Sequence, residues 1–252
     1  MNPSGKLRAH VRLRTRFRDP VAVKHDAELR WWLESWDPIL RAGGFNPGDA
    51  PAFLDGEPVA TTYEGRRWQQ ARAEVRRVAS EAGLGNESFF HGKVVVDIGP
   101  GPLGFPDACP ARVSIGVEPL AERYAAAGLL LAGSPAIYLA TGAERIPVLS
   151  ASADVVIARN SLDHVDDPVV ALGEMTRILR AGAVLILTFD TDHPPTATEP
   201  HSLTVESVRA ALGELVRITR QDLTGESFGA GTGRATIVGE RTSIRTAPRV
   251  SS

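Results

Sequence analysis

Residues 94–110 read VVVDIGPGPLGFPDACP, an apolar run that ends near an acid and then passes into alternating glycines and prolines. The run is typical of a buried β-strand, and glycines allow the loop behind it to approach a ligand closely. Gly99, Gly101 and Gly104 also spell G-x-G-x-x-G, the pattern of a dinucleotide-binding loop. The stretch therefore predicts a strand whose carboxyl end carries a ligand site.

The prolines and the acid of this loop argue against a pyrophosphate as the ligand. A pyrophosphate is held by backbone N–H groups at a helix N-terminus, and Pro100 and Pro102 each lack that donor. Pro106 and Pro110 leave room for only a turn or two of helix before the next strand. Asp97 would repel a phosphate and attract a cation. We therefore expect a ligand that carries positive charge and brings an uncharged moiety past the glycines.

Strand and helix patterns alternate along the chain after this stretch. Nearly continuous apolar runs, as expected of strands with both faces covered, predict strands at 93–98, 112–117, 136–140, 153–159 and 183–189. Helical spacing predicts helices at 120–132, 168–180 and 204–214. Two further strands, 216–223 and 235–243, flank a glycine-rich loop. We expect a doubly wound α/β domain over residues 91–246, whose mostly parallel seven-stranded sheet ends in an antiparallel hairpin.

The first 90 residues predict an extended arm followed by a helical cap. Helical spacing predicts helices at 21–42 and 61–84, separated by a loop over 45–58. All four tryptophans of the chain lie in these helices, where they either pack the cap onto the sheet domain or line a pocket for a flat substrate. Residues 11–18 alternate apolar and basic side chains, which suits an arm that pairs two subunits as a homodimer, a nucleic-acid arm or a solvated tail.

Composition restricts the class of protein. The chain has 252 residues and a net charge of −2, so its overall field favours neither nucleic acid nor an anionic membrane. No apolar run approaches the length of a membrane span, and the N-terminus lacks the apolar stretch of a signal peptide. Cys109 is the only cysteine, which excludes an internal disulfide and favours a reducing compartment, the cytoplasm.

Acidic and polar residues follow the ends of other predicted strands as well. Glu118 follows the second strand, where a carboxylate can accept both hydroxyl groups of a ribose. The third strand leads into TGAERIP (141–147) and the fourth into ARNSLDHVDDP (158–168). Ligands of doubly wound sheets bind at the carboxyl ends of the strands. A phosphate-free nucleoside that carries positive charge suits a site of this composition.

Four segments in this order resemble the class I, Rossmann-like methyltransferases that depend on S-adenosylmethionine, especially the type 11 group that acts on small molecules. VVVDIGPGPLG is similar to the first motif of that family, and GVEP is similar to its acidic ribose motif. The stretch from GAERIP to LILT is similar to the family's adenine loop and its fourth and fifth strands. The resemblance covers about residues 90–190 and implies S-adenosyl-L-methionine as the cofactor.

The resemblance also implies which residues contact this cofactor. Asp97, Gly99 and Gly101 would border the methionine part, and Glu118 would hold the ribose. Ala143 and Glu144 would lie at the edge of the adenine, and Asn160 would lie beside the methionine and sulfonium end. The chain departs from the family at Leu103, where glycine is usual. It also departs at Gly142, where an aspartate often binds the adenine amino group, and where Glu144 or a backbone carbonyl would substitute.

Two histidines are candidate general bases on the acceptor side. His164 belongs to an H-V-x-D-P segment that often serves structure or cofactor positioning in the family that the chain resembles. His193 lies in FDTDHPPTATEPHSL (189–203), which is either an acceptor-binding rim or a polar surface loop. Carboxylates and histidines gather in that segment, but no spacing matches a zinc pattern, so no metal is expected. Histidines at the rim favour an oxygen acceptor slightly over nitrogen.

The sequence therefore predicts a methyltransferase whose cap closes over a small-molecule acceptor, a metabolite or a natural product. An alternative keeps the cofactor but gives the fold a non-methylating or structural role. A nicotinamide oxidoreductase built on the three glycines is disfavoured by the prolines and by Asp97. A nucleic-acid methyltransferase is disfavoured because the chain outside the N-terminal arm is not basic.

Overall fold

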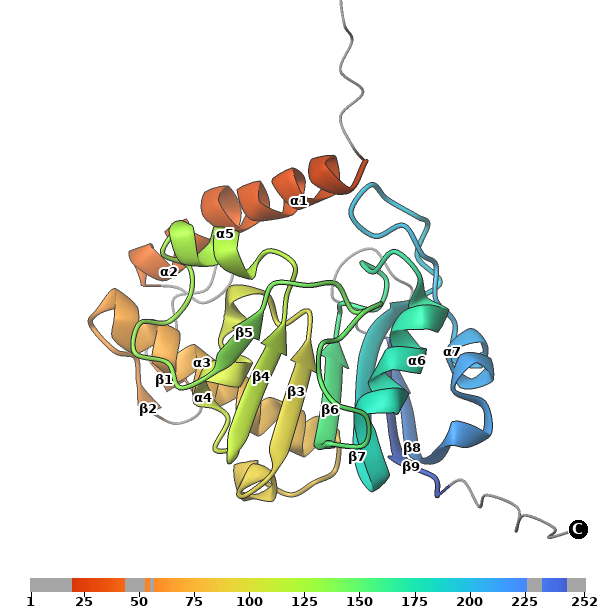
Figure 1. Ribbon diagram of the computed structural model, residues 1–252. Coiled ribbons are helices and arrows are strands. Elements are labelled where there is room, and N and C mark those ends of the chain that lie inside the picture. Colours follow the sequence, from red (N-terminus) through yellow and green to blue (C-terminus); the bar gives the residue numbers. More distant parts are fainter. Residues whose placement is uncertain (1–19, 44–52, 55–56, 226–232, 244–252) are drawn as a thin grey trace, which may run out of the picture.

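The computed structural model describes residues 20–43, 53–54, 57–225 and 233–243, with a mixed β-sheet at their centre (Figure 1). The seven strands of this sheet lie in the order β5-β4-β3-β6-β7-β9-β8. Their bounds are β3 Val94–Ile98, β4 Val113–Val117, β5 Ile137–Leu139, β6 Ala153–Arg159, β7 Leu179–Thr191, β8 Val216–Thr224 and β9 Gly233–Arg241. β3 to β7 are parallel, and β9 runs antiparallel between β7 and β8. This confirms the predicted doubly wound sheet with its C-terminal antiparallel hairpin.

Helices cover both faces of the sheet. The helices that pack on one face are α3 (Tyr63–Glu81) and α4 (Phe105–Ala108), and those on the other face are α6 (Pro168–Ile178) and α7 (Val205–Leu212). Successive side chains of a strand point to opposite faces, so Val95 packs in the cluster that includes α3 and Val96 in the cluster that includes α6. This double burial explains why the strands read as nearly unbroken apolar runs.

The N-terminal helices lie against the end of the sheet where the parallel strands finish. α1 (Pro20–Trp31), a π-helical turn (Trp32–Trp36) and α2 (Asp37–Ala42) follow one another without a break, as predicted for 21–42. α1 crosses that end of the sheet (Figure 1). Within the described ranges, no helix has both the length and the apolar character needed to cross a membrane.

Two buried arginines of α3 connect α2 and the glycine loop to this helix. Nε of Arg66 donates to the carbonyl oxygen of Leu40 at 2.7 Å. The guanidinium of Arg67 donates to the carbonyl oxygen of Pro102 at 2.8 Å and to the hydroxyl of Tyr63 at 3.1 Å. Because each arginine satisfies backbone carbonyls, its buried charge is compensated by hydrogen bonds.

Some predicted elements differ from those observed. The helix predicted over 120–132 is α5 (Ala121–Ala126), which stops early because Gly128 adopts a left-handed φ of +70°. The loop predicted over 45–58 contains two short antiparallel strands, β1 (Phe53–Leu54) and β2 (Glu57–Pro58). Short 3-10 turns occupy Glu87–Phe90, Gly101–Leu103 and Gly213–Leu215. The arm at 11–18, on which the expected homodimer rests, lies outside the described residues.

Candidate active site

The loops after β3 and β6 lie side by side where the strand order reverses. β4 pairs with β3 on one side, and the chain later returns so that β6 pairs with β3 on the other. Ligands of doubly wound sheets bind at such a reversal. Asn160, the first residue after β6, has a φ of +46°, and its N–H donates to the carbonyl oxygen of Thr188 at 2.7 Å. A left-handed conformation is uncommon outside glycine and is concentrated at functional sites, so Asn160 remains a candidate contact.

Gly99 permits these two loops to touch. Its φ is +63°, and a Cβ placed on it would lie 2.5 Å from the Cβ of Ser161. Ser161 belongs to the loop after β6, and its hydroxyl donates to the carbonyl oxygen of Ile98 at 2.7 Å. The backbone conformation and the close approach of the second loop each require glycine at this position.

Gly101 allows a close approach of the N-terminal helices. Its φ is +53°, and a Cβ placed on it would lie 3.0 Å from the indole ring of Trp32. Lys24 of α1 donates a hydrogen bond to the carbonyl oxygen of His164, in the loop after β6. The helical stretch that begins at α1 therefore covers the glycine loop and contacts the neighbouring loop.

The carboxylate of Glu118 is held at the end of β4. The residue is 2% exposed, and its oxygens accept hydrogen bonds from the N–H groups of Gly101 at 3.1 Å and Leu120 at 2.9 Å. Burial, assisted by the nearby carboxylate of Glu28, raises the pKa of Glu118 to about 7. Each carboxylate oxygen can accept about two hydrogen bonds, so Glu118 retains the capacity to bind hydroxyl groups of a ribose.

Asp97, near the end of β3, is a buried carboxylate with an incompletely compensated charge. The residue is 4% exposed, and burial raises its pKa to about 8. The positive charge of Arg159 lowers this pKa, whereas the charges of Glu74 and Glu118 raise it. Arg159 is itself bound to Glu74 and pairs with Glu81 at 3.4 Å, so its charge is shared with other carboxylates. A cationic ligand beside Asp97 would offset the cost of burying this carboxylate.

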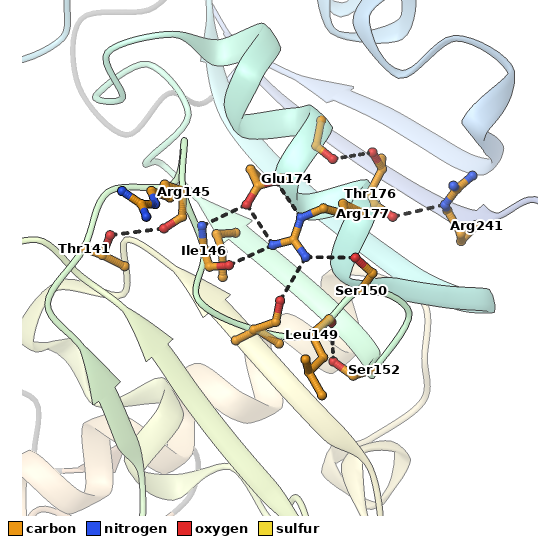
Figure 2. A network of polar contacts seen from close by, with 12 residues as sticks. Thr141, Arg145, Ile146, Leu149, Ser150, Ser152, Glu174, Thr176, Arg177 and Arg241 are labelled. Carbon is orange, nitrogen blue, oxygen red and sulfur yellow. Dashed lines mark hydrogen bonds and ion pairs between the residues drawn. The ribbon is translucent and has the colours of Figure 1, made fainter.

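The loop between β5 and β6 is fastened to α6 by a network of polar contacts (Figure 2). Glu174 of α6 accepts from the N–H of Ile146 at 2.9 Å, and Arg177 donates to the carbonyl oxygen of Ile146 at 2.8 Å. Arg177 also donates to the carbonyl oxygen of Val148 at 2.9 Å and pairs with Glu174 at 2.6 Å. This network fixes the segment that carries the two residues expected at the adenine.

Ala143 and Glu144 differ in how much of the side chain remains free to contact a ligand. Ala143 is buried. Oε1 of Glu144 accepts from the N–H groups of Asp166 at 2.7 Å and Asp167 at 3.1 Å, which links this loop to the loop after β6. A Cβ on Gly142 would lie 2.7 Å from Oε2 of Glu144, so the absence of a side chain at position 142 makes room for this carboxylate.

The two candidate bases lie on either side of Asp163. His193 is 2% exposed, and its Nε2 is 3.3 Å from Oδ2 of Asp163. Nε2 of His164 is 3.9 Å from Oδ1 of Asp163 and 3.7 Å from Oε1 of Glu199. The fold therefore joins the loop after β6 to the segment after β7.

Burial determines the charge of His164. Burial is the largest of the effects that lower the pKa of this imidazole to about 4, and the neighbouring Lys24 and His193 act in the same direction. The ring is therefore neutral at pH 7. His201, by contrast, is placed for a structural role, because its Nε2 lies 3.0 Å from the carbonyl oxygen of Val165.

Sequence reasoning missed two residues of this site. Asp163 precedes His164 directly, but nothing in an acid-rich segment distinguishes the one carboxylate that is fully buried. Trp32 was one of four tryptophans, and its contact with Gly101 depends on how the N-terminal helices fold back.

Part of the chain matches a known protein family. Residues 96–187 match the family described as methyltransferase domain. An uncharacterised methyltransferase of Mycobacterium ulcerans is 32% identical over 100 residues, which make up 39% of this chain and 39% of that protein. The chain thus spans about two fifths of the length of the curated relatives it matches, namely 39% of the first of them.

Two solved structures share the fold over most of the chain. The [4+2]-cyclase SpnF has a TM-score of 0.54 at 14% identity, with 87% of this chain and 97% of that chain covered. The magnesium protoporphyrin IX methyltransferase of Synechocystis PCC 6803, solved with bound S-adenosylmethionine, has a TM-score of 0.53 at 15% identity and the same coverages of 87% and 97%. These two likenesses show a Rossmann-like methyltransferase fold. Within this chain, the likeness to the methyltransferase domain family spans residues 96–187.

Proposed function

We propose that the protein transfers the methyl group of S-adenosylmethionine to a small-molecule acceptor, with oxygen preferred to nitrogen. The observation that carries this proposal is the pair of buried carboxylates, Asp97 and Glu118, at the ends of the neighbouring strands β3 and β4. A cation lowers the raised pKa of such carboxyl groups and a phosphate would raise it further, so the pair suits a ligand with a sulfonium, an ammonium group and a ribose. When bound, this cofactor supplies a methyl group on a cationic sulfur.

The proposed cofactor contacts are the residues expected from the sequence. They are Asp97, Gly99, Gly101, Glu118, Ala143, Glu144 and Asn160. Glu144 is the most restricted of them, because its Oε1 already binds two backbone N–H groups and only Oε2 remains for the adenine. Gly99 and Gly101 contribute by the absence of a side chain next to the cofactor.

We divide the chain into an N-terminal arm and helical cap, residues 1–90, and a cofactor-binding sheet domain, residues 91–246. We place the acceptor between the cofactor and the helical cap. The position of α1 across the end of the sheet supports this arrangement (Figure 1). Methyl transfer needs the accepting atom held in line with the methyl group and shielded from water. The single cysteine, which is buried, suits a cytoplasmic protein.

Glu118→Ala tests the ribose assignment. We expect the variant to bind S-adenosylhomocysteine at least about tenfold more weakly in titration calorimetry, a loss of about 1.4 kcal/mol, because the hydroxyl acceptor is removed. Glu122→Ala is the matched control, since it removes an exposed carboxylate of α5 four residues away and should leave the affinity unchanged. An unaltered affinity in Glu118→Ala would place the ribose elsewhere.

His193→Ala tests the acceptor side. Removal of a general base lowers turnover by about 100-fold or more, so S-adenosylhomocysteine formation from a panel of hydroxylated small molecules should fall by that factor. The affinity for the cofactor should stay within about twofold, because His193 lies outside the proposed cofactor contacts. Full turnover in the variant would show that another group acts or that no base is needed. Cofactor binding without product from any acceptor would favour the non-methylating alternative.

A further inference from the structure

Four metal-ligating side chains gather beside the loop after β6. Asp163 and His164 belong to that loop, and His193 and Glu199 belong to the segment after β7. Single ligand atoms of Asp163, His164 and Glu199 all lie within 4.8 Å of one another. The sequence predicted no metal because no spacing matched a zinc pattern, but this cluster joins two segments that are far apart along the chain.

His193 lies against the other oxygen of Asp163. Nδ1 of His193 lies 3.1 Å from the carbonyl oxygen of Pro194, which can only accept, so Nδ1 donates in this contact. Nε2 of the same ring lies 3.3 Å from Oδ2 of Asp163 and has no hydrogen-bond partner. A cation close to Asp163 would offset the cost of burying this carboxylate.

Further polar atoms lie on the other side of Asp163. Its Oδ1 is 3.9 Å from Nε2 of His164, and that nitrogen is 3.7 Å from Oε1 of Glu199, which is longer than a hydrogen bond. Oδ1 of Asp163 and Nε2 of His164 are buried and have no hydrogen-bond partner. Asp163 is 1% exposed, so bulk water does not satisfy it. One proton could bridge one of these contacts but not all of them.

We propose that Asp163, His164 and Glu199 bind a divalent transition-metal ion of the Zn²⁺ type. Imidazole nitrogens together with carboxylate oxygens suit zinc and its neighbours better than Mg²⁺ or Ca²⁺, which prefer oxygen alone. Two carboxylates face the site against one ammonium group, that of Lys24, which is bonded to the carbonyl oxygen of His164. The balance of charge therefore favours a cation.

The distances between the donors support this assignment. Zinc binds nitrogen and oxygen ligands at about 2.0–2.2 Å, so the donors of a tetrahedral site lie about 3.3–3.6 Å apart. The separations of Nε2 of His164 from its two partners, 3.7 Å and 3.9 Å, need to shorten by a few tenths of an ångström, and the third pair, Asp163 and Glu199, lies within 4.8 Å and has to draw together as well. If the protein has the proposed function, an ion here would offer a remaining position to the acceptor oxygen and lower the pKa of its hydroxyl.

Metal titration tests the site without an acceptor or a cofactor. Tag-free full-length protein is stripped with a chelator and titrated with ZnCl₂ in a calorimeter, and Co²⁺ is added separately to record the visible absorption of a four-coordinate site. We expect one equivalent of Zn²⁺ per chain. His164→Gln and Glu199→Gln should each weaken binding by at least about tenfold. His91→Gln, the same change at an exposed histidine outside the cluster, should bind as the wild type does.

The outcome depends only on metal binding. Absence of saturable binding at one equivalent, or wild-type affinity in both cluster variants, overturns the proposal. Glu199 is half-buried in an irregular segment, so its variant decides the question if His164→Gln fails to fold in a thermal-unfolding control. Because the readout involves neither methyl transfer nor S-adenosylmethionine, a failed metal titration leaves the proposed function intact, and a failed transferase assay leaves the metal site intact.

Discussion

We expect the Asp97→Asn variant to bind S-adenosylmethionine about a hundredfold more weakly than the wild-type protein does. We also expect this substitution to stabilise the unliganded chain at about pH 8. The asparagine keeps the shape of the side chain but removes the buried negative charge that faces the cationic cofactor. Asp97 is 4% exposed, so little water screens this attraction. The same burial makes the carboxylate costly when no cation is present, which is why the two effects have opposite signs.

The pKa of Asp97 sets the pH range of the stability effect. It is about 8 in the folded protein, against an ordinary value of about 4 in an unfolded chain. Between these values the folded state binds more protons than the unfolded state, so the contribution to stability is complete below about pH 4 and is lost as the pH rises to about 8. The charged groups that face Asp97 are Arg159, Glu74 and Glu118, and Glu118 contributes in the same direction because its own pKa is raised to about 7.

Two measurements check this prediction. Thermal unfolding should be measured between about pH 5 and pH 9, a range that spans these pKa values. As the pH rises, the wild type should lose stability more steeply than Asp97→Asn does. Calorimetry in buffers of different ionisation enthalpy should show that S-adenosylmethionine releases protons on binding, because a cation lowers the pKa of a neighbouring carboxyl group. Equal affinities in the two proteins, with no proton release, would contradict a cationic ligand at the end of β3.

Gly99→Ala should abolish measurable cofactor binding and lower the free energy of unfolding by about 2–5 kcal/mol, the sum of left-handed strain and overpacking. The new Cβ would lie 2.5 Å from the Cβ of Ser161, an atom joined directly to the backbone. Ser161 cannot rotate this atom away, so the loop after β6 has to move. Asn160 would move with it, and the cofactor site would lose its geometry.

Gly92→Ala separates strain from close approach. Gly92 has a similar φ of +73°, but a Cβ there would meet nothing within 4 Å. We expect this control to lose only about 1–2 kcal/mol of stability and to keep its cofactor affinity. Chemical denaturation and calorimetry on both variants give the comparison. If both variants lose the same free energy of unfolding, the close approach of Ser161 is not the reason that position 99 requires glycine.

The sheet and its acidic strand ends were predictable because burial on both faces leaves a simple signal. Strands covered on both sides are largely apolar, so an acid near the carboxyl end of such a run stands out. In the register of β3 with β4, Asp97 lies opposite Gly116 and Ile98 opposite Val117, which places Glu118 just beyond the end of the pair. Two carboxylates at one edge of the sheet follow directly from this alignment.

Contacts between distant segments were not predictable in this way. Trp32 covers Gly101 only because the N-terminal helices turn back over the sheet, and no periodicity encodes that direction. Oε1 of Glu144 binds Asp166 and Asp167 because two loops meet in space, and the grouping around Asp163 has the same origin. The early end of α5 is a different case, since Gly128 was visible inside the predicted helix and marked its limit.

The position of α3 restricts how this protein can be recombined with its relatives. Val75 and Val78 of α3 share a core with Val95 of the sheet, and Arg67 holds the carbonyl oxygen of Pro102. A chimaera made to change acceptor selectivity should therefore be spliced before Thr62, where the helix begins, so that only the preceding segment is grafted. A splice at residue 90 would replace α3 by the helix of a relative, whose side chains are not matched to those of β3.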